Sequence, residues 1–430
     1  MNENRHNALV SWIQRTPEGW TVKRLKYAVR LVSEKIEPGA SGLRYIGLEH
    51  VESWTGRLIE DTEGEGSADG LSTKFGPNDV LFGKLRPYLA KVYRAEQKGV
   101  CSGELLVLRP TLLDSRYLNY FLLMNEFIGA VDASTYGSKM PRANWEFIGN
   151  LPVLVPSVNE QREIADFLDR ETAAIDTLTA KKTRFIDLLN EKRQALVTHA
   201  VTKGLDPNVK MKDSGEEWLE EIPAQWDVVP SNRFFVESKK RAHEEDEHLS
   251  ATQKYGVIPL AEFERLEGRQ VTHAEKNLEQ RKHVEVDDFV ISMRSFEGGI
   301  ERVKARGCVR SSYVALVADE RAHVGFFSYL FKSSAYIQGL QATAMFIRDG
   351  QDLNYNNFRQ VKLPFPSTDE QSRIAEFLDR EISKSSALLA KTEEAINELL
   401  EYRSALISAA VTGQIDVRTY RPQEVAAPCQ

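Results

Sequence analysis

Apolar side chains recur at helical spacing along two long stretches of the chain. In residues 159–202 they follow one another at intervals of 4, 7, 3, 7, 4 and 7, which is one stripe of a long amphipathic helix. A second stretch near 370–412 repeats the stripe, although Ser385 and Thr392 interrupt it, as Lys182 interrupts the first. The expected core positions are Ile164, Leu168, Ile175, Leu178, Phe185, Leu189 and Leu196 in the first helix and Ile374, Leu378, Leu388, Ala395, Leu399 and Leu406 in the second.

Residues at both ends of each stretch predict where the helices begin and end. Each begins after a Pro-Ser pair, 156–157 or 366–367, with Asn159 or Asp369 as the expected cap. Each should end near a glycine, Gly204 or Gly413. Forty-odd residues make a rod of about 60–65 Å. Because neither rod hides its stripe alone, we expect the two helices to pack together, antiparallel if the halves are related by a pseudo-two-fold axis.

The two helical stretches are copies of one sequence. EQREIADFLDRE at 160–171 recurs as EQSRIAEFLDRE at 370–381, and 157–206 laid over 367–416 without a gap gives 23 identities in 50 positions. Upstream the similarity is weaker, as between PEGW at 17–20 and PAQW at 223–226. The chain is therefore read as two tandem halves, 1–210 and 211–430.

The segment before each helix reads as a mixed α/β domain with short strands. Apolar runs at 79–82, 105–108, 289–291 and 313–317 are bounded by Gly, Pro or charges, while 116–127 and 324–340 look helical. The predicted class is α+β: two mixed α/β domains in a pseudo-two-fold arrangement, separated by two long antiparallel helices packed as a coiled-coil-like spacer. The expected boundaries are 1–150 and 211–362 for the domains, 151–210 for the first helix, and 363–430 for the second helix and the tail.

Composition narrows the class of protein. A net charge of −7 argues against indiscriminate binding to phosphate or anionic lipid. Three cysteines, far apart in sequence, indicate a reducing compartment. Since neither a signal peptide nor an apolar run of about 18 residues is visible, we expect a cytoplasmic protein without membrane association.

Three sets of motifs are informative: LPVLVPSVNEQREIADFL from Leu151 and its copy from Leu363, WLEEIPAQW at 218–226, and DVLFGKLRPY at 79–88. Taken together, these motifs resemble the specificity (S) subunit of type I restriction-modification systems. The resemblance covers nearly the whole chain. It implies two target-recognition domains that each read one half of a bipartite asymmetric site on double-stranded DNA, with the helices as a spacer and no chemistry on this chain.

The resemblance also implies partners and cofactors. Two modification (M) subunits would supply S-adenosylmethionine and adenine methylation, and restriction (R) subunits would supply ATP-driven translocation and DNA cleavage with Mg. This chain itself should bind no cofactor. A rod fixes the separation of two readers, and on B-DNA each base pair takes about 3.4 Å, so helix length would set the spacing.

Candidate DNA contacts are basic and amide side chains. Basic residues interleaved with aromatics are typical of phosphate contact and stacking, whereas Arg reads guanine and Asn or Gln reads adenine. The first-half candidates are Lys84, Arg86, Tyr88, Lys91, Arg94, Lys139, Arg142 and Asn144. The second-half candidates are Arg294, Arg302, Lys304, Arg306, Arg310, Arg348, Gln351, Asn354, Asn356 and Asn357. A solvated strand edge is the alternative for the basic residues, and turn formation for the polar ones.

Signals for catalysis are missing or weak. Neither a GxxxxGK[ST] loop nor a GxGxxG after a predicted strand occurs. Asp79 with the Glu96-Gln97-Lys98 run only loosely imitates a metal nuclease, and His243 and His248 flank an acidic run that reads as solvated rather than metal-binding.

Three questions stay open, one about a surface and two about the class of protein. The Arg170-Glu171 and Arg380-Glu381 pairs form either ordinary helix ion pairs or a surface offered twice to one partner. A self-sufficient nuclease or methyltransferase would use the repeats only for dimerisation. A protein–protein scaffold is the other alternative class of protein, and the overall acidity of the chain favours it.

Overall fold

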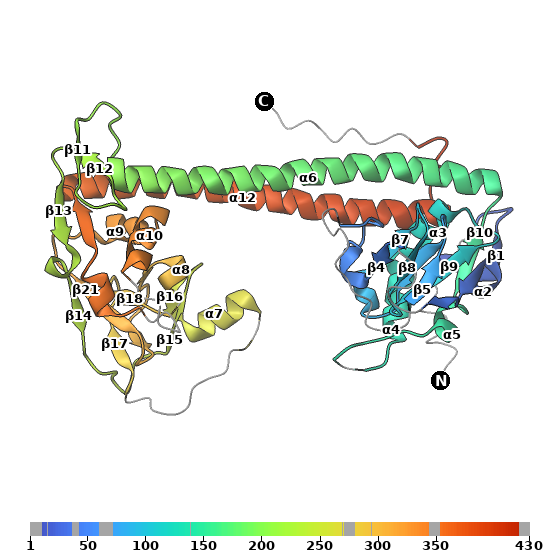
Figure 1. Cartoon of the computed structure of the whole chain (residues 1–430), viewed down its shortest axis with the longest axis horizontal. Coiled ribbons are helices and arrows are strands. Elements are labelled where there is room, and N and C mark those ends of the chain that lie inside the picture. Colours follow the sequence, from blue (N-terminus) through green and yellow to red (C-terminus); the bar gives the residue numbers. More distant parts are fainter. Residues whose placement is uncertain are drawn as a thin grey trace. The chain divides into compact units, whose positions relative to one another are not determined.

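The computed structural model describes residues 11–14, 16–36, 43–59, 72–137, 139–268, 270, 280–293, 295–343 and 353–420. The chain divides into two compact units, which are described separately (Figure 1). Unit 1 comprises Met1–Thr183 and Glu393–Gln430, and unit 2 comprises Arg184–Thr392. Each unit therefore contains one globular domain together with part of both long helices.

The long helices are α6 (Val158–Lys203) and α12 (Thr368–Val411). The cap of α6 is Ser157 rather than the expected Asn159: its Oγ accepts from the Glu160 N–H at 3.3 Å, and Glu160 Oε2 accepts from the Ser157 N–H at 3.0 Å. Ser367 caps α12 in the same way through the Glu370 N–H at 3.3 Å, so Asp369 was also the wrong residue. A serine directly before the first turn reaches the N3 amide, whereas Asn159 and Asp369 already lie inside the helix.

The predicted helix ends are confirmed. Lys203 is followed by Gly204 at φ +79°, and α12 ends two residues before Gly413 at φ +68°. This left-handed conformation suits glycine at a helix C-terminus.

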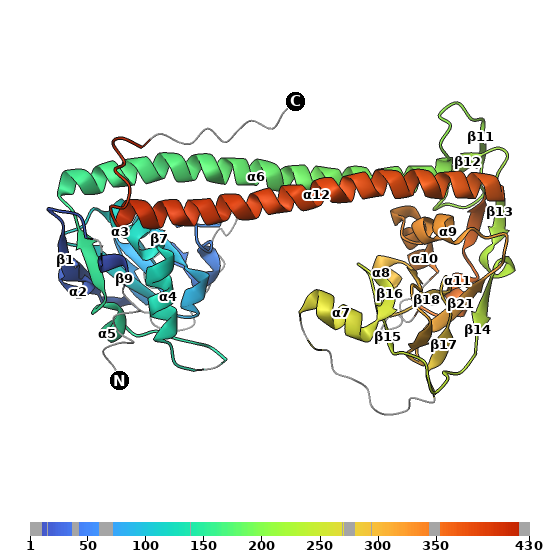
Figure 2. The same ribbon diagram turned by 180° about the vertical axis from the view of Figure 1, so that it is seen from behind.

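Within each unit the two helices run antiparallel, which the view from behind also shows (Figure 2). In unit 1 the start of α6 and the end of α12 share one core, formed on the helices by Ile164, Leu168, Ile175, Leu406, Ile407 and Ala410. In unit 2 the end of α6 meets the start of α12 through Val197, Ala200, Val201, Ile374 and Leu378. The antiparallel packing is thus confirmed in both units.

The expected stripe fails near the middle of the helices. Leu178, Phe185 and Leu388 are exposed, at 44%, 43% and 43%. Leu189, Leu196 and Leu399 are half-buried, and Thr392, expected to interrupt the stripe, is buried. A straight helix drifts by about 20° per heptad, so positions seven residues apart leave the contact face.

The domain of unit 1 contains two four-stranded sheets, packed with short helices. The first sheet has the antiparallel order β2 (Val29–Val32), β9 (Leu105–Pro110), β6 (Val80–Gly83), β7 (Val92–Arg94). The second has the order β3 (Lys35–Ile36), β5 (Ser72–Phe75), β8 (Gly99–Cys101), β4 (Tyr45–Ile46). The helices are α2 (Leu25–Ala28), α3 (Ser115–Leu122), α4 (Asn125–Ala133) and α5 (Trp145–Ile148), with 3₁₀ turns η1 (Ser11–Ile13), η2 (Leu48–His50) and η3 (Pro87–Leu89). The helix expected at 116–127 is thus two helices.

The domain of unit 2 repeats the first of these sheets, whereas its remaining strands form separate pairs. Its main sheet has the order β14 (Phe235–Ser238), β21 (Val314–Ala318), β18 (Phe289–Ile291), β19 (Glu301–Arg302). Smaller pairs are β11 (Met211–Asp213) with β12 (Glu221–Pro223), β15 (Leu249–Thr252) with β16 (Gly256–Pro259), and β17 (Lys282–Val284) with β20 (Gly307–Val309). The helices are α7 (Leu260–Glu267), α8 (Ser295–Gly298), α9 (Val324–Leu330), α10 (Ser334–Ala342) and α11 (Tyr355–Phe358), with η4 (Ser231–Arg233).

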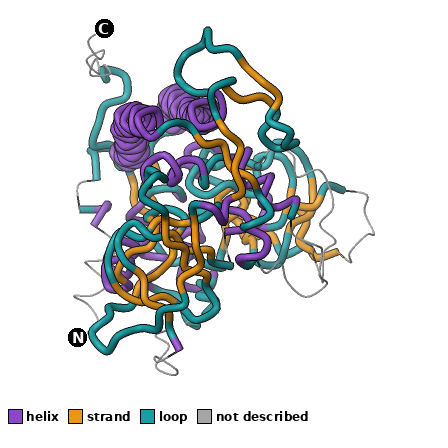
Figure 3. Tube along the Cα trace, turned by 90° about the vertical axis from the view of Figure 1, so that its left-hand side faces the viewer, coloured by secondary structure: helices purple, strands orange, loops and turns teal. Residues whose placement is uncertain are grey.

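A strand pair ties each domain to its long helix at equivalent places. In unit 1, β1 (Thr21–Arg24) pairs with β10 (Pro152–Val155), directly before α6. In unit 2, β13 (Asp227–Pro230) pairs with β22 (Lys362–Phe365), directly before α12. The predicted strands are confirmed: β6, β9, β18 and β21 overlap the apolar runs at 79–82, 105–108, 289–291 and 313–317. Figure 3 distinguishes the strands from the long helices by colour. None of the helices in the described part of the chain has the length and hydropathy of a membrane-crossing segment.

Candidate nucleic-acid interface

The repeated Pro-Ser-x-x-Glu-Gln motif fastens each domain to its helix. Gln161, 1% exposed, accepts at Oε1 from the Asp114 N–H at 2.6 Å, and its Nε2 donates to the Pro156 carbonyl at 3.0 Å. Asp114 caps α3, so the glutamine holds the start of the domain's first helix. The orientation of the first domain relative to the start of α6 therefore depends on the buried side chain of Gln161.

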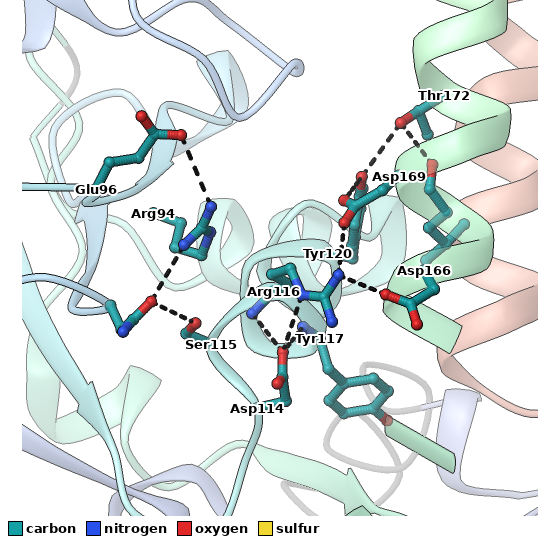
Figure 4. Close-up of polar contacts among 12 residues, drawn as sticks. Arg94, Glu96, Asp114, Ser115, Arg116, Tyr117, Tyr120, Asp166, Asp169 and Thr172 are labelled. Carbon is teal, nitrogen blue, oxygen red and sulfur yellow. Dashed lines mark hydrogen bonds and ion pairs between the residues drawn. The ribbon is translucent and has the colours of Figure 1, made fainter. Parts of the chain in front are cut away.

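The FLDRE sequence that follows adds a polar network (Figure 4). Arg116 on α3 pairs with Asp166 at 2.6 Å and Asp169 at 3.0 Å, and the Tyr120 hydroxyl donates to Asp169 at 2.7 Å. Burial, above all, raises the pKa of Tyr120, so this hydroxyl stays protonated and continues to donate. The aspartate of the repeat thus serves to dock the domain.

The charged pair after this aspartate behaves differently in the two copies. Arg170 Nε donates to Glu171 Oε1 at 2.9 Å along the helix, whereas Glu381 pairs with Lys384 at 2.8 Å. Both glutamates thus use ordinary intrahelical partners.

Two predicted segments of the first domain lie side by side. The Arg86 N–H donates to the Pro141 carbonyl at 2.8 Å, and the Ala143 N–H donates to the Lys84 carbonyl at 2.9 Å. These bonds join the loop between β6 and β7 to the segment between α4 and α5. We call the result the first-domain face; it comprises Lys84, Arg86, Tyr88, Lys139 and Asn144, of which all but the half-buried Lys84 are exposed.

Arg86 has an unusual backbone. Its φ of 49° and ψ of 62° lie in the left-handed region, which glycine adopts most easily because it has no Cβ. The hydrogen bond from the Arg86 N–H to the Pro141 carbonyl holds it there. Such strain is often found where a side chain must be aimed in a fixed direction.

Three other predicted residues of the first half are engaged inside the protein. Arg142 makes two bonds of 3.1 Å to Glu104, and Lys91 Nζ donates to the Leu48 and Val51 carbonyls at 2.6 and 2.9 Å. Burial lowers the pKa of Lys91. Arg94 donates to Asn78 Oδ1 at 3.1 Å. These contacts favour structural roles for the three side chains.

In the second domain, too, some candidate DNA contacts have acidic partners within the protein and others are exposed. Arg302 pairs with Asp287 at 2.6 Å and Arg306 lies 3.7 Å from Glu285, while Lys304 and Arg310 are exposed. Arg294, Arg348 and Gln351 lie outside the described residues.

The asparagine candidates mark helix starts in both domains. Asn144 caps α5 through the Phe147 N–H at 2.8 Å, and Asn354, 210 positions later, caps α11 through the Asn356 N–H at 2.8 Å. Asn357 completes that capping box, whereas Asn356 is exposed. Turn formation therefore accounts for Asn144 and Asn354.

Sequence reasoning missed two sets of exposed residues in unit 1. Tyr136 and Met140 lie beside the first-domain face at 61% and 46% exposure. A basic set on β1, α2 and β2 comprises Lys23, Arg24, Lys26 and Arg30, all exposed. The available signal was the run TVKRLKYAVR at 21–30, which holds four basic and no acidic residues.

The weak catalytic motifs have structural explanations. Asp79 is 1% exposed and accepts two bonds of 2.7 Å from Arg109 and one of 2.8 Å from the Gly76 N–H, so its carboxylate is fully used. Asp246, in the acidic run near His243, accepts from the His243 N–H at 2.8 Å. Across the described ranges, no group of three His, Cys, Asp or Glu side chains is placed to hold a metal ion.

Comparison with known proteins gives this geometry its context. Residues 71–185 match the model of the type I restriction modification DNA specificity domain. The chain is thus similar to type I specificity subunits. It is 24% identical to the type I restriction enzyme EcoDI specificity subunit of Escherichia coli over 43% of this chain and 42% of that protein. It is 23% identical to the putative MjaX specificity subunit of Methanocaldococcus jannaschii over 94% of this chain and 95% of that protein.

The fold agrees with the same family. A solved structure from a study of complex assembly and conformational transition in the type I R-M system superposes with a TM-score of 0.69 at 15% identity, covering 93% of this chain and all of the other. The resemblance and the fold class predicted from the sequence are thereby confirmed. The relatives are named as specificity subunits of restriction enzymes, and the matching family model is described as a DNA specificity domain.

Proposed function

We propose that the two domains each read one half of a bipartite, asymmetric DNA site. The observation that carries the proposal is that the main sheets of both domains share one strand order but present different side chains at matched positions. On β2 and β9, Arg30 stands opposite Arg109, whereas on β14 and β21 the matched pair is Val236 opposite Val317. Readers of one fold with different surfaces suit two different half-sites.

Charge indicates how each half-site is held. In the first domain Lys84, Arg86 and Lys139 supply cations for phosphates or guanine edges, and Tyr88 supplies a ring for apolar contact. In the second, Lys304 and Arg310 are the exposed cations and Asn356 the exposed amide. Lysine contacts set register, while arginine and asparagine contacts carry sequence information.

In this proposal the helices form the spacer. At 1.5 Å per residue, 46 and 44 residues correspond to about 69 and 66 Å. The domains occupy 1–150 and 211–362, and the helical segments 151–210 and 363–430. In the same proposal, two M subunits carrying S-adenosylmethionine and R subunits using ATP and Mg perform methylation and cleavage. The support is that the relatives are named as specificity subunits of restriction enzymes.

The test is a methylation map of DNA from cells with the intact gene and its neighbouring methyltransferase, compared with cells lacking only this gene. A split adenine-methylated motif should disappear with the gene. Deleting residues 180–186 and 390–396 together removes two turns from each helix, about 10 Å, and should shorten the gap by about three base pairs without changing either half-site.

A matched control replaces both heptads with alanine-rich sequence of equal length, which should leave the gap unchanged. An unaltered gap in the deletion variant would refute the spacer role. Methylation that persists without the gene would favour a scaffold, and turnover of DNA by the purified chain alone would establish an enzyme.

A further inference from the structure

Arg193 and Arg403 occupy the same position in the two copies of the long helix, 210 residues apart, but have different surroundings. Arg403 is 5% exposed and fully engaged inside unit 1. Its Nε donates to Asp176 Oδ1 at 2.8 Å, and its Nη1 donates to the Trp54 carbonyl at 2.9 Å. The charge of Arg403 is therefore neutralised within the protein.

The second copy lacks this carboxylate. The position that matches Asp176 is Ser386, which cannot form an ion pair. Arg193 is half-buried, and no Asp or Glu in the described part of unit 2 lies within 4 Å of its guanidinium nitrogens. A partly desolvated guanidinium without a counter-charge costs free energy that an anionic ligand would recover.

Arg193 lines a cavity of about 600 Å³ that lies wholly within unit 2. The walls come from α6 and α12 on one side and from β16, β19 and α9 of the domain on the other. The basic residues of the lining outnumber the acidic ones; they are Arg193, Lys254, Arg302, Lys304 and Lys332, against Glu301 and Asp379.

Both acidic side chains of the cavity already have donors. Glu301, 3% exposed, pairs with Lys332, whose Nζ also donates to the Gly298 carbonyl at 2.9 Å. Asp379 accepts from the Tyr329 hydroxyl at 2.6 Å. Arg302 is neutralised from outside the cavity by Asp287. Apart from these two ion pairs, the lining holds Arg193, Lys254 and Lys304 against the one carboxylate of Asp379, so its charge balance is positive. Arg193 lies on the helix wall and Lys304 on the opposite, domain wall.

We propose that this cavity binds a phosphate of the DNA backbone, with Arg193 as its main ligand. The inference rests on the proposed function and adds to it a fixed anchor between the second domain and the helices. A guanidinium offers paired donors that match phosphate oxygens. The equivalent place in unit 1 already holds Asp176, so the anchor belongs to the second half-site alone.

The test uses the full chain assembled with its partner subunits and a duplex carrying the motif that the methylation map defines. Arg193→Ala should weaken binding about tenfold and reduce the slope of log affinity against log salt by about one. Ser386→Asp supplies the carboxylate that unit 1 has, and it should weaken binding similarly while leaving Arg193 in place. Lys192→Ala, which removes the same charge one residue away outside the cavity, should change affinity less than twofold.

Phosphate as the ligand is tested with duplexes that carry one neutral methylphosphonate at successive positions of the second half-site. One position should weaken binding by the intact complex and have no further effect with Arg193→Ala. The proposal is overturned if the Arg193→Ala and Ser386→Asp complexes bind DNA as tightly as wild type, or if Lys192→Ala weakens DNA binding as much as Arg193→Ala. It is also overturned if Arg193→Ala impairs subunit assembly instead of DNA binding, because that result would indicate an acidic protein partner. Failure of the proposed function itself is distinct, because the wild-type complex would then not discriminate the motif from a scrambled duplex.

Discussion

Gln371 repeats the hydrogen bonds of Gln161 at a distance of 210 residues. Its Oε1 accepts from the His323 N–H at 2.7 Å and its Nε2 donates to the Pro366 carbonyl at 2.9 Å. His323 caps α9 as Asp114 caps α3. Both buried glutamines therefore fasten the N-cap residue of a domain helix to the first turn of a long helix.

Replacing either glutamine should loosen its own unit. Gln161→Leu and Gln371→Leu keep the volume but leave a buried backbone N–H without an acceptor, which should lower the free energy of unfolding by about 2 kcal/mol. Urea unfolding measures the change. Gln194→Ala, at an exposed position of α6, is the control, and an equal loss there would mean that the buried hydrogen bonds carry no special weight.

Asp79 and Arg109 should prove to be a structural pair. Because Asp79 is buried and its three hydrogen bonds come from Arg109 and Gly76, Asp79→Ala should destabilise unit 1 by about 2–3 kcal/mol. A double-mutant cycle with Arg109→Ala isolates the pair. Additive losses would contradict direct coupling, and retained stability with lost DNA binding would restore a functional role for Asp79.

His283 should make the stability of unit 2 depend on pH. Its Nδ1 and Nε2 lie 2.8 Å from Asp246 and 2.9 Å from Glu285. Burial by itself lowers the pKa of His283, but the hydrogen bonds to Asp246 and Glu285 outweigh it and raise the pKa above its usual value. The stabilisation is then full below about pH 6.5, the unfolded value, and is lost as pH rises through the folded pKa.

Thermal unfolding at pH 6, 7 and 8 checks this dependence. The wild-type chain should become less stable across the series, and His283→Gln should flatten the trend, whereas His199→Gln, at an exposed position of α6, should not. A wild-type curve that rises over the same range would show that His283 is neutral in the folded chain.

Arg86 should act on the first half-site alone. Arg86→Gly removes the charge and suits the left-handed backbone, so it should fold at least as well as wild type while weakening DNA binding about tenfold. Base substitutions in the first half-site should then matter less, and those in the second half-site as much as before. Arg184→Ala, on the exposed surface of α6, is the control; equal loss of discrimination at both half-sites would reduce Arg86 to a general electrostatic role.

The sequence by itself determined the doubling of the chain, the two long helices, the principal strands and the resemblance to type I specificity subunits. These features are written in local or repeated signals: the helical period, the glycines past each helix, apolar runs and a motif that occurs twice. Even so, the caps were placed two residues late, because Ser157 and Asn159 are both good capping residues and only backbone geometry distinguishes them.

Only the tertiary structure decided which charges are available. Arg86, Arg142 and Lys91 look alike in sequence, yet Arg142 is bound to Glu104 and Lys91 to two carbonyls, while Arg86 is exposed. Likewise Arg193 and Arg403 are identical residues in matched sequence. Arg403 has Asp176 of the other long helix as its partner, whereas the position that matches Asp176 in the second copy is Ser386. A side chain's charge is set by its residue type, but whether that charge is free depends on neighbours that are distant in sequence and brought close only by folding.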